Sequence, residues 1–235
     1  MIQATPHISA TSSRLARFLA DLGAAAPVSH RDFTQRLGQL FDLADSIKLS
    51  KTHRKPSAAS FKPGVSSAAA IREEFLRARA SIVSSTLRSF VPGADPPRLR
   101  FPLPTADGAA AETIDPEPYL TFYSAQQREI DFRIRNLHAK TRDELAGCSP
   151  ALAQIAALDS ALGGPIAAHS RPFFAAVPEL LQNRIDFLRS RDDSDSNAAL
   201  EQIRNEIQGL LLAEIETRLL PTLGLIEALD ELDDE

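Results

Sequence analysis

Residues 117–147 read EPYLTFYSAQQREIDFRIRNLHAKTRDELAG, and this stretch decides the fold class because its apolar residues recur at the spacing of a long α-helix. Steps of three and four residues separate Leu120, Tyr123, Gln127, Ile130, Ile134, Leu137 and Thr141. Glu129 precedes Arg133 by four residues, and Asp131 precedes Arg135 in the same way, which favours a helix. The seam is short and includes polar members, so we favour a bundle helix over a free coiled coil, with packing against another chain as the alternative.

The same helical spacing continues on both sides of this stretch, and alternating strand patterns are sparse. Further helices are predicted within 11–23, 29–50, 67–93, 149–164, 170–191 and 198–235. Gly163-Gly164 predicts a helix stop, and Pro178 predicts a kink or a break. Pro221 and Gly224 are expected to kink or divide the last helix. The sequence therefore predicts an all-α fold, with about seven helices in an elongated antiparallel bundle.

Residues 91–118 interrupt this pattern with seven prolines. Proline fixes φ and removes a backbone donor, so a helix or a central strand is a poor fit here. We expect a long Pro-rich loop or arm, anchored by Leu99, Phe101 and Leu103 or forming a short edge strand. It would separate an N-terminal helical region, 1–90, from a C-terminal helical bundle, 119–235, unless the two pack as one domain.

Charge is unevenly distributed along the chain, whose formal net charge is −5. Residues 1–100 carry +8 and residues 101–235 carry −13. The candidate anion-binding or partner-binding residues lie in the basic segment 48–62, which contains no acid: Lys48, Lys51, Arg54, Lys55 and Lys62. Phe61 and His53 are the segment's only aromatic residues, so an acidic protein surface is favoured over nucleic acid. The simplest interpretation is that the two halves attract each other within one molecule.

No motif in the sequence carries a recognisable chemistry. There is no glycine-rich phosphate loop, and the five His residues are scattered, so no catalytic, cofactor-binding or metal-ligating residues are predicted. His138 is interpreted as a boundary residue of its helix, and Cys148 as a small residue at a turn. A single cysteine fits a reducing cytosol, and neither a signal peptide nor a run approaching a membrane span is expected. These features predict a cytoplasmic protein without membrane insertion.

The short leucine-rich stretch SRLARFLADLG at 13–23, followed by SHRDFTQRLGQLFDLADSIKLS at 29–50, resembles the start of an uncharacterised bacterial family called domain of unknown function 3348. The matching positions are Arg36, Leu37, Gly38, Gln39, Asp42, Asp45, Ser46, Ile47, Leu49 and Ser50. The later segments QQREI, SPALAQIAALD and VPELL are also similar, so the resemblance spans most of the chain except the Pro-rich segment. It implies a cytoplasmic bacterial protein whose gene neighbours encode membrane proteins similar to flagellar stator and peptidoglycan-binding components. It implies no activity and no catalytic residues.

Two functional hypotheses follow. The first is a non-enzymatic helical adaptor or assembly protein that binds a protein partner or self-associates, in the service of a membrane-associated, stator-like machine. The second is a nucleic-acid-associated protein that uses segment 48–62.

Overall fold

A computed structural model describes residues 14–15, 50, 61, 63–93, 99–102, 114–190 and 196–233. Four α-helices make up most of this part: α4 (Ala68–Arg88), α5 (Glu117–Leu145), α6 (Pro150–Arg189) and α7 (Ser196–Asp233). The described residues contain no β-strand, so the all-α prediction is confirmed. The helices predicted within 11–23 and 29–50 lie outside the described residues, apart from helical Arg14, Leu15 and Ser50.

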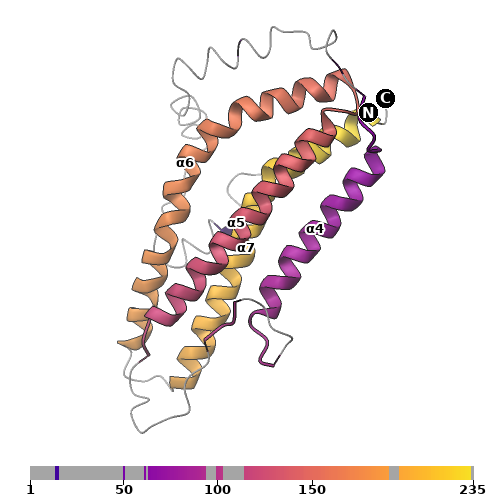
Figure 1. Cartoon of the computed structure of the whole chain (residues 1–235). Coiled ribbons are helices and arrows are strands. Elements are labelled where there is room, and N and C mark those ends of the chain that lie inside the picture. Colours follow the sequence, from indigo (N-terminus) through magenta and orange to yellow (C-terminus); the bar gives the residue numbers. More distant parts are fainter. Residues whose placement is uncertain are drawn as a thin grey trace, which may run out of the picture.

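Helices α5 and α7 form the centre of the bundle, and α4 and α6 lie on opposite sides of this pair (Figure 1). The central pair is parallel, because Tyr123 pairs with Glu214 and, further along both helices, Asp131 pairs with Arg218. Consecutive helices along the chain run in opposite directions (Figure 1). Each outer helix is therefore antiparallel to both central helices.

Local signals in the sequence set the helix starts. The Ser67 hydroxyl accepts from the Ala70 amide at 3.3 Å and caps α4. The Ser149 hydroxyl caps α6 in the same way, accepting from Leu152 N at 3.2 Å, and Pro150 occupies the first helical position, where its missing N–H costs nothing. These two starts lie where the sequence predicted them.

The seam predicted for α5 packs against other helices of the same chain. Its buried members are Tyr123, Ile130, Ile134, Leu137 and Thr141, while Leu120 and Gln127 are half-buried. They join a single hydrophobic core that also takes in residues of α4, α6 and α7. Burial of this seam against neighbouring helices of the same chain is what a bundle helix requires.

The predicted helix stop at Gly163-Gly164 is wrong, and of the two alternatives given for Pro178 and for Pro221, a kink or a break, the break is not found. The stretches 149–164 and 170–191 form one 40-residue helix, α6, which runs through Gly163, Gly164, Pro165, Pro172 and Pro178. Helix α7 likewise continues through Pro221. A proline inside a helix removes one backbone hydrogen bond and can bend the helix without ending it. Figure 1 shows the result in α6, which is bent in its middle and bows away from α5.

Because α6 is continuous, it reaches the length of a membrane-spanning helix. Of the described helices, α6 alone is long and apolar enough to cross a membrane, with an 18-residue window of mean hydropathy 1.3. The sequence prediction missed this window because it divided the helix at Gly163-Gly164. Only 11% of the window is buried within the fold.

Part of the Pro-rich segment 91–118 is described, and it contacts the bundle through Phe101. The Phe101 ring stacks on Phe90 with centroids 5.1 Å apart, and it lies within 5.4 Å of Tyr119 and Phe122. Its amide donates to the Ser89 carbonyl at 2.8 Å. Leu103 and the rest of residues 103–113 lie outside the described residues, so the Pro-rich arm stays a prediction.

Ion pairs join the basic and acidic halves of the sequence within one molecule. Arg14 lies 3.2 Å from Glu216 of α7, and Arg72 of α4 pairs with Asp230 near the end of α7. Leu15, next to Arg14, is buried in the core. These contacts are of the kind that attraction between the halves would produce.

Candidate functional site

A buried carboxylate organises the interior between α5 and α7. Glu214 of α7 is fully buried, and a charge removed from water must be hydrogen-bonded or paired. Tyr123 donates its hydroxyl proton to Glu214 Oε1, and Gln127 Nε2 donates to the same oxygen at 2.8 Å. Arg218 Nε donates to the other oxygen at 3.3 Å. One α7 carboxylate thus holds two α5 side chains in place.

Arg218 connects this interior to the surface. Its second donor, Nη1, lies 2.8 Å from Asp131 Oδ1, and its guanidinium carbon stands 3.6 Å from the ring centroid of Phe174 on α6. Asp131 Oδ2 in turn forms an ion pair with Arg135 Nη2 at 2.8 Å. A guanidinium over an aromatic face is a favourable cation–π contact. The network therefore links three helices and ends at exposed Arg135.

The position of Tyr123 in this network strongly raises the pKa of its hydroxyl. Burial raises the pKa of the Tyr123 hydroxyl well above its usual value of 10.0, and the negative charge of Glu214 and its hydrogen bond raise it further. Arg218 opposes this effect and lowers the pKa. Tyr123 is consequently a neutral hydrogen-bond donor under ordinary conditions.

An open pocket of about 390 Å³ lies over the outer end of this network, between α5 and α6. Four arginines line it: Arg128 and Arg135 from α5, Arg171 from α6 and Arg218 from α7. Asp131 is the single carboxylate among the described lining residues. Small side chains of α6, including Ala167, Ser170 and Ala175, complete the wall.

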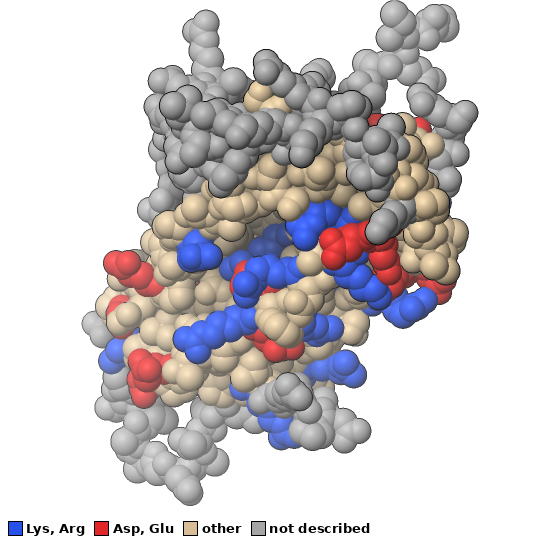
Figure 2. Space-filling model, turned by 45° about the horizontal axis from the view of Figure 1, so that its top comes forward, with Lys and Arg blue, Asp and Glu red and all other residues tan. Residues whose placement is uncertain are grey.

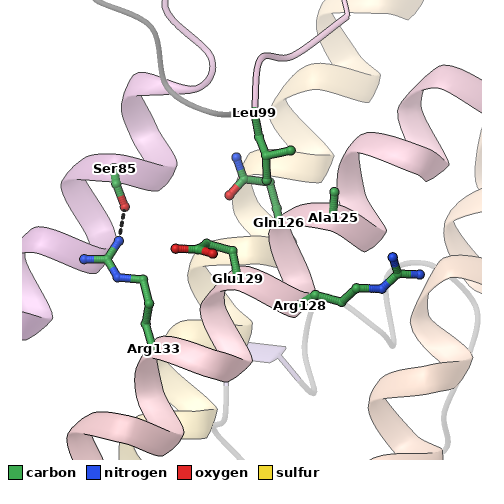
Figure 3. Close-up of a pocket in the computed structure, with 7 residues that line it drawn as sticks. All are labelled: Ser85, Leu99, Ala125, Gln126, Arg128, Glu129 and Arg133. Carbon is green, nitrogen blue, oxygen red and sulfur yellow. Dashed lines mark hydrogen bonds between the residues drawn. The ribbon is translucent and has the colours of Figure 1, made fainter.

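A second pocket, of about 460 Å³, lies between α4 and α5. Figure 3 shows Arg133 at its edge, where Nη1 donates to the Ser85 hydroxyl at 2.6 Å and Nη2 to Ser81 at 2.9 Å. Arg128 lines this pocket at its base, but in Figure 3 its side chain points away from Ser85 and toward α6. The guanidinium of Arg128 is therefore directed to the arginine-lined pocket.

His138 joins three helices. Its Nδ1 lies 3.1 Å from the Thr222 hydroxyl of α7, and its Nε2 lies 2.9 Å from Asp159 Oδ2 of α6. Arg142 approaches the same Asp159 oxygen at 3.8 Å. Thr222 is fully buried, whereas the side chains of His138 and Asp159 keep 21% and 19% of their surface exposed, so this Thr–His–Asp arrangement ties the three helices together from the interior to the surface. The partners of His138 are remote in sequence, and no local pattern could have indicated them.

Helix α6 also presents an apolar stripe to the outside. Ile166, Phe173, Leu180 and Phe187 follow one another at seven-residue intervals, which places them on one side of the helix. Phe173 and Phe187 keep 46% and 53% of their surface exposed, and Ile166 keeps 41%. We call these four residues the α6 stripe. Leu180 is partly buried against the core, while the other three members leave an apolar surface, with the spacing of a helix-packing seam, that the described part of the chain does not cover.

None of the side chains predicted from the sequence as an anion-binding or partner-binding site can be placed. Lys48, Lys51, Arg54, Lys55 and Lys62 all lie outside the described residues. Within the described ranges, no three His, Cys, Asp or Glu side chains gather as metal ligands would. Cys148 is half-buried in the turn between α5 and α6, where its Sγ approaches the Glu144 carbonyl at 3.6 Å.

The fold and these sites define an all-α helical-bundle protein with a hydrophobic core, a buried polar network around Glu214 and an arginine-lined pocket. The chain belongs to the family described as "Protein of unknown function (DUF3348)", whose model matches residues 1–231. The resemblance found in the sequence is thereby confirmed. No curated protein and no solved structure matches the chain.

Proposed function

We propose that the protein is a non-enzymatic helical adaptor or assembly protein of the cytoplasm, and that it binds another protein chain through the α6 stripe. The α6 stripe carries this proposal. Large apolar side chains repeated every seven residues on an open helix face cost solvation free energy unless another surface covers them. A helix of a partner chain fits such a stripe by inserting side chains between successive members.

The membrane-spanning composition of α6 has a different explanation under this proposal. Asp159 of α6 contacts His138, and Arg184 of α6 is paired with Glu206 of α7 at 2.8 Å. Insertion of α6 into a bilayer would break these contacts and leave polar groups in hydrocarbon, which is unfavourable. We therefore assign the apolar character of α6 to protein contact.

The non-enzymatic part of the proposal is supported by the way the ionisable groups are used. His138 is held between Thr222 and Asp159, and Glu214 is enclosed by Tyr123 and Arg218. These groups satisfy one another between helices, which is a structural use of polar residues. The gene neighbourhood implied by the family resemblance suggests a partner in a membrane-associated, stator-like machine.

The test combines a substitution with a partner assay. Phe173→Ser with Phe187→Ser removes the two largest members of the α6 stripe, and Leu76→Ser with Val91→Ser removes exposed apolar side chains elsewhere as the matched control. Each protein is used as bait in extracts of its own host, with mass spectrometry to identify captured proteins, and its mass is measured by light scattering. We expect a captured protein or a self-associated species that is lost in the α6 variant and kept in the control.

A strictly monomeric protein whose captured proteins do not depend on Phe173 and Phe187 would overturn the proposal. Self-association through the stripe would identify the partner as a second copy. Circular dichroism of both variants separates loss of binding from loss of folding.

The alternative function is nucleic-acid binding through segment 48–62, favoured by five basic residues with no intervening acid. Retention on DNA at low salt tests it, with Lys51→Ala, Arg54→Ala and Lys55→Ala combined in one variant. Retention that depends on these three residues would support the alternative. An absence of retention, or retention unchanged by the substitutions, would exclude it.

A further inference from the structure

We propose that the pocket between α5 and α6 binds a small phosphate-bearing anion. The site is formed by Arg128, Arg135 and Arg171 at its rim and by Arg218 at its base. This inference goes beyond the adaptor function and does not depend on it.

The pocket concentrates positive charge in the acidic part of the chain. Residues 101–235 contain eleven Lys and Arg side chains against 24 acids, yet four of those eleven line this one pocket, where the described part of the chain contributes a single acid to the lining. Figure 2 shows Lys and Arg side chains gathered around a hollow on one face of the molecule. A single solvent-exposed arginine is common on a protein surface. Four arginines from three helices around one pocket, in an acidic part of the chain, call for a specific explanation.

The charges at the rim lack sufficient counter-charge within the protein. Asp131 forms ion pairs with both Arg218 and Arg135, while Glu214 is buried inside the bundle and pairs with Arg218 there. Among the described residues, no carboxylate or hydrogen-bond acceptor pairs with Arg128 or Arg171. Guanidinium groups that face one opening repel each other, and a bound anion would remove that cost.

The geometry suits phosphate. Arg128 points toward α6 in Figure 3, and Arg171 is on the α6 wall of the same pocket. Their helices are fixed at this level, because Gln127, next to Arg128, donates to the Phe174 carbonyl of α6 at 3.0 Å. Guanidinium forks bind phosphate oxygens in pairs, and two forks from opposite walls can hold different oxygens of one group.

The size of the pocket limits the ligand. A volume of about 390 Å³ is within the range of small-molecule sites and exceeds what a single inorganic phosphate requires. The α6 wall is built of Ala167, Ser170 and Ala175, which leave room without adding charge. A diphosphate group, free or attached to a small organic body, matches both the charge and the space.

The experiment measures binding of pyrophosphate to the full chain by titration calorimetry at low salt, with citrate as a carboxylate of comparable charge. Arg128→Gln combined with Arg171→Gln removes the two rim guanidiniums that have no partner among the described residues. Arg77→Gln combined with Arg79→Gln changes the same net charge on the exposed face of α4 and serves as the control. Pyrophosphate should bind the parent and the control alike, and removal of each rim guanidinium should weaken binding roughly tenfold or more.

Three results would overturn the proposal: no pyrophosphate binding by the parent protein, equal binding by all three proteins, or tighter binding of citrate than of pyrophosphate. Arg128- and Arg171-dependent retention of DNA without pyrophosphate binding would also overturn it, because the ligand would then be a macromolecule. Thermal unfolding of each variant verifies that the fold is retained. None of these outcomes depends on whether the α6 stripe binds a protein.

Discussion

Gly64 and Gly147 meet backbone to backbone where the segment before α4 passes the turn between α5 and α6. The Gly64 amide donates to the Gly147 carbonyl at 2.8 Å, and a Cβ on Gly147 would lie 2.8 Å from Gly64 Cα. Only residues without side chains can approach so closely. The contact pins the start of α4 to the far end of α5.

Substituting Gly147→Ala should therefore destabilise the fold. The new methyl group meets backbone, which cannot move aside as a side chain can, so we expect a loss of about 1–3 kcal/mol in the free energy of unfolding. Chemical denaturation monitored by circular dichroism measures it. Gly163→Ala is the control, because Gly163 lies inside α6 with open space around it, and this change should stabilise by about 0.5–1 kcal/mol. Equal effects at the two positions would contradict the close approach.

Removing the Tyr123 hydroxyl should also destabilise the bundle. Tyr123→Phe leaves the buried Glu214 carboxylate without one of its donors, at an expected cost of about 1–3 kcal/mol. Tyr119→Phe provides the comparison, since Tyr119 is a second largely buried tyrosine of α5 outside the Glu214 network. Denaturant midpoints of the two variants should differ clearly. A Tyr123→Phe protein as stable as the parent would argue against the network.

The raised pKa of Tyr123 predicts a loss of stability at alkaline pH. Below about pH 10 the hydroxyl is protonated in both the folded and the unfolded chain, so its contribution does not change with pH. Above that pH the unfolded chain releases the proton while the folded chain keeps it, which favours unfolding by about 1.4 kcal/mol per pH unit.

The parent protein should therefore lose stability more steeply above pH 10 than Tyr123→Phe does, as measured by denaturation at a series of pH values. Tyr119→Phe should recover a smaller part of the slope, because the pKa of Tyr119 is also raised by burial. Identical slopes for parent and Tyr123→Phe would exclude the proposed shift.

A double-mutant cycle should detect coupling between His138 and Thr222. His138→Ala removes the imidazole that contacts the buried Thr222 hydroxyl, and Thr222→Val removes the hydroxyl with little change in shape. If the two groups interact as the geometry indicates, the double variant should be about 1 kcal/mol more stable than the two single effects predict when added. Simple additivity would show that the contact contributes nothing to stability.

The helices and their starts could be predicted from the sequence because they depend on local information. Ser67 and Ser149 cap the helices they precede, and the spacing of Ile130, Ile134 and Leu137 identifies the buried side of α5. Helix breaks were harder to predict. Gly163-Gly164 and the prolines that follow disfavour a helix locally, but packing of residues such as Leu181 and Ile185 in the core keeps α6 continuous beyond them.

The candidate sites could not be predicted, because their parts are distant in the sequence. Tyr123 and Glu214 are 91 positions apart, and His138 and Asp159 belong to different helices. The pocket arginines come from three helices, two from α5 and one each from α6 and α7, with no local clustering to compare with segment 48–62. A run of basic residues such as segment 48–62 is visible in the sequence itself. Arginines that are far apart in the sequence form a pocket only when their helices pack together, and the sequence does not show that packing.

The bend of α6 has a consequence in terms of length. Helix α6 has 40 residues and its antiparallel neighbour α5 has 29, so α6 is about 16 Å longer along its axis. Helix α5 ends and α6 begins at the turn that joins them, and α6 bows outward while α5 takes a straighter course (Figure 1). The small residues Ala167 and Ser170 line the pocket from this bowed helix. The extra length of α6 allows it to bow away from α5 and leave room for the pocket. We expect that removing one helical turn from the middle of α6, with all four arginines retained, would bring α6 closer to α5 and close the pocket.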